Sequence, residues 1–146
     1  MKDTKLWSLF CQKYGVASKN WEAWAFDGDP DTLADLVMRG IKTGTSSSYD
    51  LSILEKEPLP QSGSYSVILD SKGNAKCIIE TTKVYIVPFC EVSPSHAYKE
   101  GEGDRSLSHW REVHKAFFTQ RLQAYGIPFT QDSRIICEEF NLVFVP

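Results

Sequence analysis

Apolar side chains recur at helical spacing in three stretches of the chain. The first covers residues 3–14, and the second follows a turn at 27–31 and stops at Gly40. The third runs from 107 to about 125, where a glycine and a proline end it. We therefore predict three amphipathic helices, whose apolar faces carry Leu6, Phe10 and Cys11; Leu33, Leu36 and Val37; and Leu107, Trp110, Val113, Phe117 and Leu122.

Runs of apolar and β-branched residues predict strands in the second half of the chain. Residues 65–69 and 76–89 flank an Asp-Ser-Lys-Gly-Asn turn and should pair as an antiparallel hairpin. Residues 134–145 predict a last strand, whereas the proline-containing stretch 51–63 and the segment at Pro94 are expected to be loops. Helices before and between the strands predict an α+β domain, in which a small mixed or closed sheet pairs strands over long sequence distances.

Length and charge limit the classes of protein that the chain can represent. Its 146 residues are enough for one domain with a hydrophobic core. The net charge of −3 excludes the broad basic surface that binds long nucleic acids and leaves room only for a small basic cleft. The four cysteines lack Cys-x-x-Cys or zinc spacing, so we expect reduced, mostly buried thiols. No signal-peptide pattern or membrane-length apolar run is evident, which predicts a cytoplasmic protein.

The first candidate for chemistry is the stretch 40–45, Gly-Ile-Lys-Thr-Gly-Thr, which continues into three serines. Here a helical pattern stops and an extended, hydroxyl-rich segment begins. Lys42 could simply neutralise the negative end of the preceding helix dipole. Alternatively, a partly desolvated Lys42 could act as a base or nucleophile. It could act together with Thr45 only if the segment bends, which Gly44 permits.

The second candidate is the acidic, glycine-containing run 100–106. If this run is extended, Glu100, Glu102 and Asp104 share one face, and the glycines allow a ligand to approach closely. A solvated acidic loop is the alternative, and the run lacks the full ligand pattern of a calcium site. Ser106 is expected to cap the following helix or to contact a ligand. We predict no metal and no cofactor.

Aromatic residues and histidines offer further candidates. Trp24 and Phe26 could fill the core or form a stacking surface. Asp29 is placed to cap the second helix. His114 is expected to be half-buried and hydrogen-bonded on its helix, whereas His96 and the third histidine, at 109, are expected to face solvent. No nucleophile–histidine–acid spacing, phosphate-binding loop or dinucleotide motif occurs.

Two sets of residues resemble the ASCH domain family. The run 36–45 contains the Gly-x-Lys-x-x-Thr pattern that is typical of the family. A second set resembles its YhfF-like branch, and the resemblance covers residues 20–145 in all. This second set consists of Trp24-x-Phe26-x-Gly28-Asp29, the run 100–107, Trp110-Arg111, His114, Phe117-Phe118 and Glu139-Phe140-x-Leu142-Val143.

The resemblance implies a PUA-like mixed or antiparallel β-barrel flanked by helices, with residues 1–146 as a single domain and an N-terminal helix at about 3–14. Members of the family are proposed to bind RNA or nucleotide-like ligands in a cleft beside the lysine motif. One small bacterial branch consists of amidohydrolases that act on N4-acetylcytidine through a lysine, a threonine and a glutamate. Another member is a ribonuclease.

Carried onto this sequence, the resemblance makes Lys42 and Thr45 catalytic, together with Glu100 or Glu102. The spacing from Ala97 to the glycine at 101 favours Glu100. Many members carry arginine two residues after the threonine, and the serine found here weakens an interpretation based on phosphate binding. The predicted ligand-binding set is Trp24, Phe26, Asp29, Ser47, Asp104, Arg105 and Ser106.

Three functional hypotheses follow from these residues. In the first, Lys42 takes the proton of Thr45, which attacks an acyl carbon, and Glu100 or Glu102 protonates the leaving amine. In the second, the protein binds or cleaves RNA without amidohydrolase activity, through a lysine–phosphate contact and aromatic stacking. In the third, it is a protein-interaction domain with a vestigial cleft. The expected partner is a nucleoside- or nucleotide-like molecule or RNA, and no membrane; the oligomeric state is not predicted.

Overall fold

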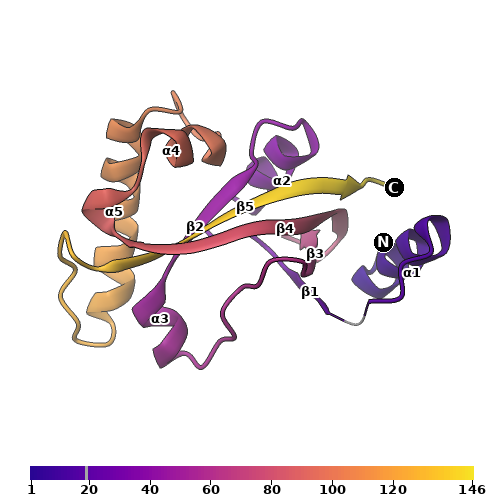
Figure 1. The fold of residues 1–146 in the computed structure, drawn as a ribbon, viewed down its shortest axis with the longest axis horizontal. Coiled ribbons are helices and arrows are strands. Elements are labelled where there is room, and N and C mark those ends of the chain that lie inside the picture. Colours follow the sequence, from indigo (N-terminus) through magenta and orange to yellow (C-terminus); the bar gives the residue numbers. More distant parts are fainter. Residues whose placement is uncertain (19) are drawn as a thin grey trace. The chain divides into compact units, whose positions relative to one another are not determined.

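The computed structural model describes residues 1–18 and 20–146 and contains one mixed sheet together with helices (Figure 1). The strand order is β1-β3-β4-β5-β2, with β1 parallel to β3 and with antiparallel β3–β4 and β2–β5 pairs. The strands are β1 (Trp21–Trp24), β2 (Gly44–Ser48), β3 (Tyr65–Leu69), β4 (Ala75–Pro88) and β5 (Arg134–Phe144). The helices are α1 (Asp3–Tyr14), α2 (Pro30–Met38), α3 (Tyr49–Leu54), α4 (Pro94–Glu100) and α5 (Leu107–Gln123), with a 3₁₀ turn at Phe89–Glu91.

The sheet confirms the α+β class but corrects the expected barrel. The short strands β1 and β2 stand at the two ends of the strand order, so the sheet in the described residues is open. The predicted hairpin is present: Asp70 and Asn74 close the turn, and Gly73 has the positive φ of 80° that such a turn needs. None of the described helices is long and apolar enough to cross a membrane.

The chain divides into two compact units, which we describe separately. Unit 1 comprises Met1–Thr43, Gln61–Lys83 and Phe140–Pro146. Successive side chains of a strand point to opposite faces of the sheet, and the core of unit 1 lies on both faces accordingly. Val67 packs with α1 residues such as Leu6, whereas its neighbour Ile68 packs with Val37 of α2. The two helices therefore cover opposite faces of the unit 1 sheet.

Unit 2 comprises Gly44–Pro60 and Val84–Glu139. Its core joins α4 and α5 to β5 through side chains that include Ala97, Trp110, Phe118 and Cys137. Two of its helices lie where loops were expected. Ser48 caps α3, whose last residues, 51–54, fall in the expected loop 51–63, and Ser93 caps α4 at Pro94. The loop prediction at Pro94 was wrong because a proline in the first helical turn starts a helix rather than breaking it.

Candidate functional site

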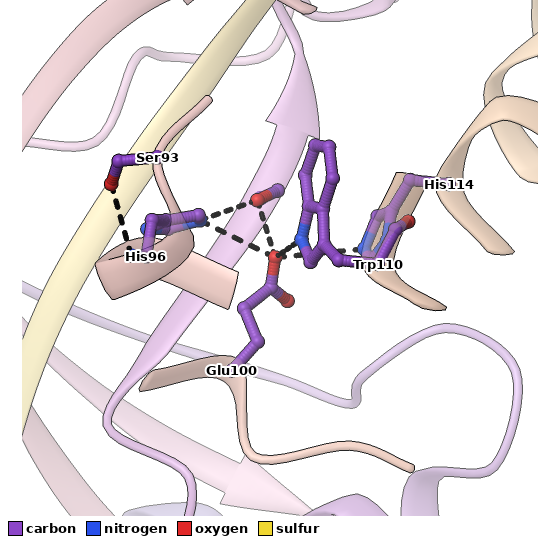
Figure 2. A network of polar contacts seen from close by, with 6 residues as sticks. Ser93, His96, Glu100, Trp110 and His114 are labelled. Atoms are coloured by element: carbon purple, nitrogen blue, oxygen red, sulfur yellow. Dashed lines mark hydrogen bonds and ion pairs between the residues drawn. The ribbon is translucent and has the colours of Figure 1, made fainter. Parts of the chain in front are cut away.

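The most densely connected polar group of unit 2 is the carboxylate of Glu100, the last residue of α4, which is only 2 % exposed. Its Oε2 accepts hydrogen bonds from the Ser46 hydroxyl at 2.5 Å and from the Trp110 indole nitrogen. The Nε2 atoms of His96 and His114 lie 3.3 and 3.6 Å from the same oxygen. Figure 2 shows His96 on one side of the carboxylate and Trp110 and His114 on the other. We call these five side chains the Glu100 cluster.

Local helical geometry brings the Glu100 cluster together. His96 and Glu100 are four residues apart on α4, and Trp110 and His114 are four residues apart on α5, so each pair shares one helix face. The Trp110 and His114 rings stack, with centroids 4.3 Å apart and planes at 15°. Ser46 comes from β2, which packs on α4. Two helices and one strand therefore hold the carboxylate.

The two histidines of the Glu100 cluster differ in their surroundings. Burial lowers the pKa of His114, but the hydrogen bond to Glu100 and its charge, with help from the Trp110 carbonyl and Glu102, outweigh this and raise the pKa overall. His96 is 1 % exposed, and its Nε2 lies 2.7 Å from the Ser46 hydroxyl. Its Nδ1 is buried without a hydrogen-bond partner in the part of the chain that the structure describes.

Thr45 and Ser47 flank Ser46 on β2, opposite Glu138 and Ile136 of β5. Successive strand side chains point to opposite faces, so Thr45 and Ser47 lie on the face opposite Ser46. Within unit 2, Ser46 is thus the hydroxyl that meets Glu100.

Lys42 lies in unit 1, just after α2, and is 2 % exposed. Its backbone N–H donates to Leu36 O at 3.1 Å and closes the end of the helix. The Nζ atom lies 5.2 Å from the centroid of Phe26, a cation–π contact. The Lys42 side chain is therefore almost completely removed from solvent.

The aromatic and capping residues of unit 1 have structural roles. Phe26 is buried in the core, and Trp24 packs edge-on against it with a centroid distance of 4.8 Å. Asp29 is the N-cap of α2 and accepts hydrogen bonds from the backbone and hydroxyl of Thr32. These hydrogen bonds hold the pKa of the Asp29 carboxyl below its ordinary value.

The acidic run does not present its acids on one face. Glu100 ends α4, and Gly101 follows in the left-handed conformation, so the run is not an extended strand. Glu102 is half-buried and Asp104 is exposed. Hydrogen bonds from the side chain and then the backbone of Ser106 lower the pKa of the Asp104 carboxyl.

The other two residues that were predicted to contact a ligand here, Arg105 and Ser106, stabilise the segment between α4 and α5. Ser106 is the N-cap of α5 and accepts from the backbone of His109 at 3.1 Å. Arg105 stacks its guanidinium on Tyr98, 3.5 Å from the ring centroid, and its Nε donates to the Tyr98 carbonyl at 3.0 Å. In the described residues no group of three or more His, Cys, Asp or Glu side chains is arranged to hold a metal ion.

Sequence reasoning missed two members of the Glu100 cluster. His96 was expected to face solvent but is buried. The expectation was wrong because α4 was not predicted. The Ser93-Pro94 start signal and the four-residue spacing from His96 to Glu100 were the available signals. Ser46 was missed because nothing in a run of hydroxyl residues shows which one pairs with a carboxylate 54 positions away.

Comparisons with known proteins identify relatives of the chain. The ASCH domain family matches residues 22–144. The crystal structure of an ASCH domain from Lactobacillus crispatus JV V101 is 32 % identical, covers 94 % of both chains and superposes with a TM-score of 0.84. A protein from Enterococcus faecalis V583 is 36 % identical over 97 % of this chain and 88 % of its own, with a TM-score of 0.87. A search among curated proteins gave no significant match.

Proposed function

Because the chain belongs to the ASCH domain family, we propose that the Glu100 cluster serves a nucleoside- or nucleotide-type ligand and that the protein hydrolyses the amide of an N4-acylated cytidine. The observation that carries this proposal is the Glu100 carboxylate, which is buried yet contacted by four side chains at one oxygen. The proposal treats residues 1–146 as one ASCH domain of the YhfF-like branch, acting in the cytoplasm.

The Glu100 cluster supports this proposal on energetic grounds. Removing a carboxylate from water costs several kcal/mol unless donors replace the water. An apolar side chain at position 100 could fill the same space without that cost. Groups whose protonation is shifted by burial and a specific partner concentrate at functional sites, and His114 beside Glu100 is such a group.

The proposed reaction uses the residues that the family resemblance indicates. The Thr45 hydroxyl gives its proton to Lys42, and its oxygen attacks the acyl carbon to form an ester. The carbon–nitrogen bond breaks, and Glu100 delivers a proton to the departing N4 amine. Because regular strand geometry points Thr45 away from the face on which Ser46 meets Glu100, this step requires β2 to depart from that geometry at Thr45 when substrate binds. Water then attacks the ester: Glu100 takes one proton of this water, Lys42 returns its proton to the Thr45 oxygen, and the carboxylic acid leaves. Glu102 is the alternative acid.

The test is hydrolysis of N4-acetylcytidine, followed by chromatography of the released cytidine. Lys42→Ala and Thr45→Ala should abolish turnover. Glu100→Gln and Glu102→Gln form a matched pair: the first should lose activity and the second should keep it. Each variant is checked for an unchanged circular dichroism spectrum. If the folded wild-type protein releases no cytidine, or if Lys42→Ala keeps full turnover, the hydrolase proposal is wrong.

RNA binding is the second candidate, and the Arg105–Tyr98 stack favours it. Tyr98 is 56 % exposed, and an arginine plane on an aromatic ring is a surface on which single-stranded bases stack. Binding of short single-stranded RNAs should weaken with added salt and with Arg105→Ala. Lys115→Ala, which removes an exposed cation of α5, is the charge-matched control. Equal effects of the two variants would reject the stack as a base-binding surface.

A further inference from the structure

The hydrogen bonds of His114 show where its titrating proton resides. Nδ1 lies 2.9 Å from the carbonyl oxygen of Trp110, and a carbonyl can only accept, so Nδ1 carries a hydrogen. In the neutral ring Nε2 is then the bare nitrogen. Protonation of His114 therefore occurs at Nε2, which faces Oε2 of Glu100 at 3.6 Å. The proton that makes His114 a cation lies between the imidazole and the carboxylate.

His96 has the opposite arrangement. The Ser46 hydroxyl has one hydrogen, which it donates to Glu100, so it must accept a hydrogen from Nε2 of His96. A second proton on His96 would sit on Nδ1, which is buried with no acceptor among the described residues. Such an unpaired buried donor is unfavourable. Of the two histidines in the Glu100 cluster, only His114 has a polar partner at both ring nitrogens among the described residues.

The difference between His114 and His96 matters for the step of the proposed reaction in which the leaving amine is protonated. The Glu100 oxygen that accepts hydrogen bonds from Ser46 and Trp110 is also the one that faces Nε2 of His114, so a proton on that nitrogen lies against the acid of the proposed reaction. We propose that His114 is a positioning residue that holds the proton for Glu100 and passes it through Oε2 to the leaving group. This inference rests on the proposed function for its last step, and on the geometry of unit 2 for the shared proton.

Each proton that moves in this step has a donor and an acceptor. The His114 imidazolium loses its Nε2 proton to Glu100, and Glu100 gives it to the amine nitrogen as the carbon–nitrogen bond breaks. His114 is left neutral with its hydrogen on Nδ1. When water attacks the ester, Glu100 takes one proton of this water and passes it back to Nε2 of His114, while Lys42 returns its proton to the Thr45 oxygen and the carboxylic acid leaves.

The polar and titratable groups around the His114–Glu100 pair come from four elements, α4, β2, α5 and β5. Glu100 faces His96 on its own helix, Ser46 on β2, and Trp110 and His114 on α5. The charge of Glu100 also acts on Cys137 of β5, and that of Glu102 on His114.

Nuclear magnetic resonance titration of the histidine rings tests the shared proton without any substrate. The chain has three histidines, so His114 can be assigned by comparing the wild-type spectrum with those of His109→Gln and His114→Gln. The ring of His114 should titrate above the ordinary pH of about 6.5 in the wild type and at a lower pH in Glu100→Gln. Glu112→Gln, on an exposed position of the same helix, should leave it unchanged. Titration at or below the ordinary value, or no response to Glu100→Gln, overturns the proposal.

Kinetics test the transfer step. In the wild type, kcat for N4-acetylcytidine should fall as pH rises through the titration of His114. His114→Gln should lower kcat, leave KM little changed and remove that alkaline limb. An unchanged pH profile in this variant overturns the transfer. If the wild type shows no turnover, the proposed function and the transfer step fail together, while the titration still decides whether His114 and Glu100 share a proton. If His114→Gln does not fold, the spectra of His96→Gln and His109→Gln assign the His114 ring by elimination, and the comparison of wild type with Glu100→Gln is made as before.

Discussion

Replacing Ser46 by alanine isolates one contact of the Glu100 cluster. The substitution removes the hydrogen bond of 2.5 Å from the hydroxyl to Oε2 and leaves the ring of His96 with Glu100 itself as an acceptor at 3.3 Å. A hydrogen bond to a charged group contributes about 1.5–3 kcal/mol. We therefore expect the free energy of unfolding to fall by about 2 kcal/mol. Little packing is lost, because serine and alanine differ by one oxygen.

Ser47→Ala is the matched control for this prediction, since it makes the same chemical change one residue away on the opposite face of β2. A half-buried serine outside such a network should cost no more than about 0.5 kcal/mol. With a urea dependence of about 2 kcal/mol per molar, Ser46→Ala should unfold at a urea concentration about 1 M lower than the wild type. Urea titration monitored by tryptophan fluorescence measures the unfolding midpoints of both variants. Equal midpoints for the two variants would show that the Ser46 contact does not stabilise the fold.

Three further predictions concern other parts of the molecule. Burial raises the pKa of the Cys77 and Cys137 thiols to about 12, so alkylation at pH 8 followed by mass spectrometry should modify the exposed Cys90 first and those two only after denaturation. Gly103→Ala and Gly73→Ala should each cost about 1 kcal/mol in thermal unfolding because both glycines have a positive φ, and Gly103→Ala should in addition displace the ring of His109, whose Nε2 lies 2.3 Å from the new Cβ. The raised pKa of His114 means that its stabilisation is present below the ordinary histidine value and is lost as pH rises through the folded-state value. His114→Gln should therefore lose stability against the wild type at pH 5.5 and much less at pH 9, and an equal loss at both would contradict the ion pair.

Elements governed by local signals could be predicted from the sequence. The helices α1, α2 and α5 and the β3–β4 hairpin follow from apolar spacing, end residues and turn chemistry. The seven-residue helix α4 was missed because it is too short to show a periodic apolar face. The aromatic segment that forms β1 was not assigned for a similar reason, since four residues show no clear alternation.

The candidate site was predictable only in part. The family pattern singled out Glu100 and Lys42, and both are buried. The partners of Glu100 depend on which face of β2 meets α4, and the pairing of β2 with β5 decides this across about ninety residues of chain. No local pattern contains that information. The cysteines show the same limit: Cys77 and Cys137 are buried as expected, whereas Cys11 is half-buried and Cys90 is exposed.

The way the chain is shared between the two units limits how the protein can be divided. The backbone passes from one unit to the other four times, after Thr43, Pro60, Lys83 and Glu139, and two of these passages lie inside the continuous strands β4 and β5. No single cut releases either unit as an intact piece. A fragment that ends in either strand would expose an unpaired strand edge, which promotes aggregation. During translation, unit 2 is complete only after Glu139 has been added, and unit 1 only after residues 140–146 have followed. A fusion partner therefore belongs at a terminus rather than between the units.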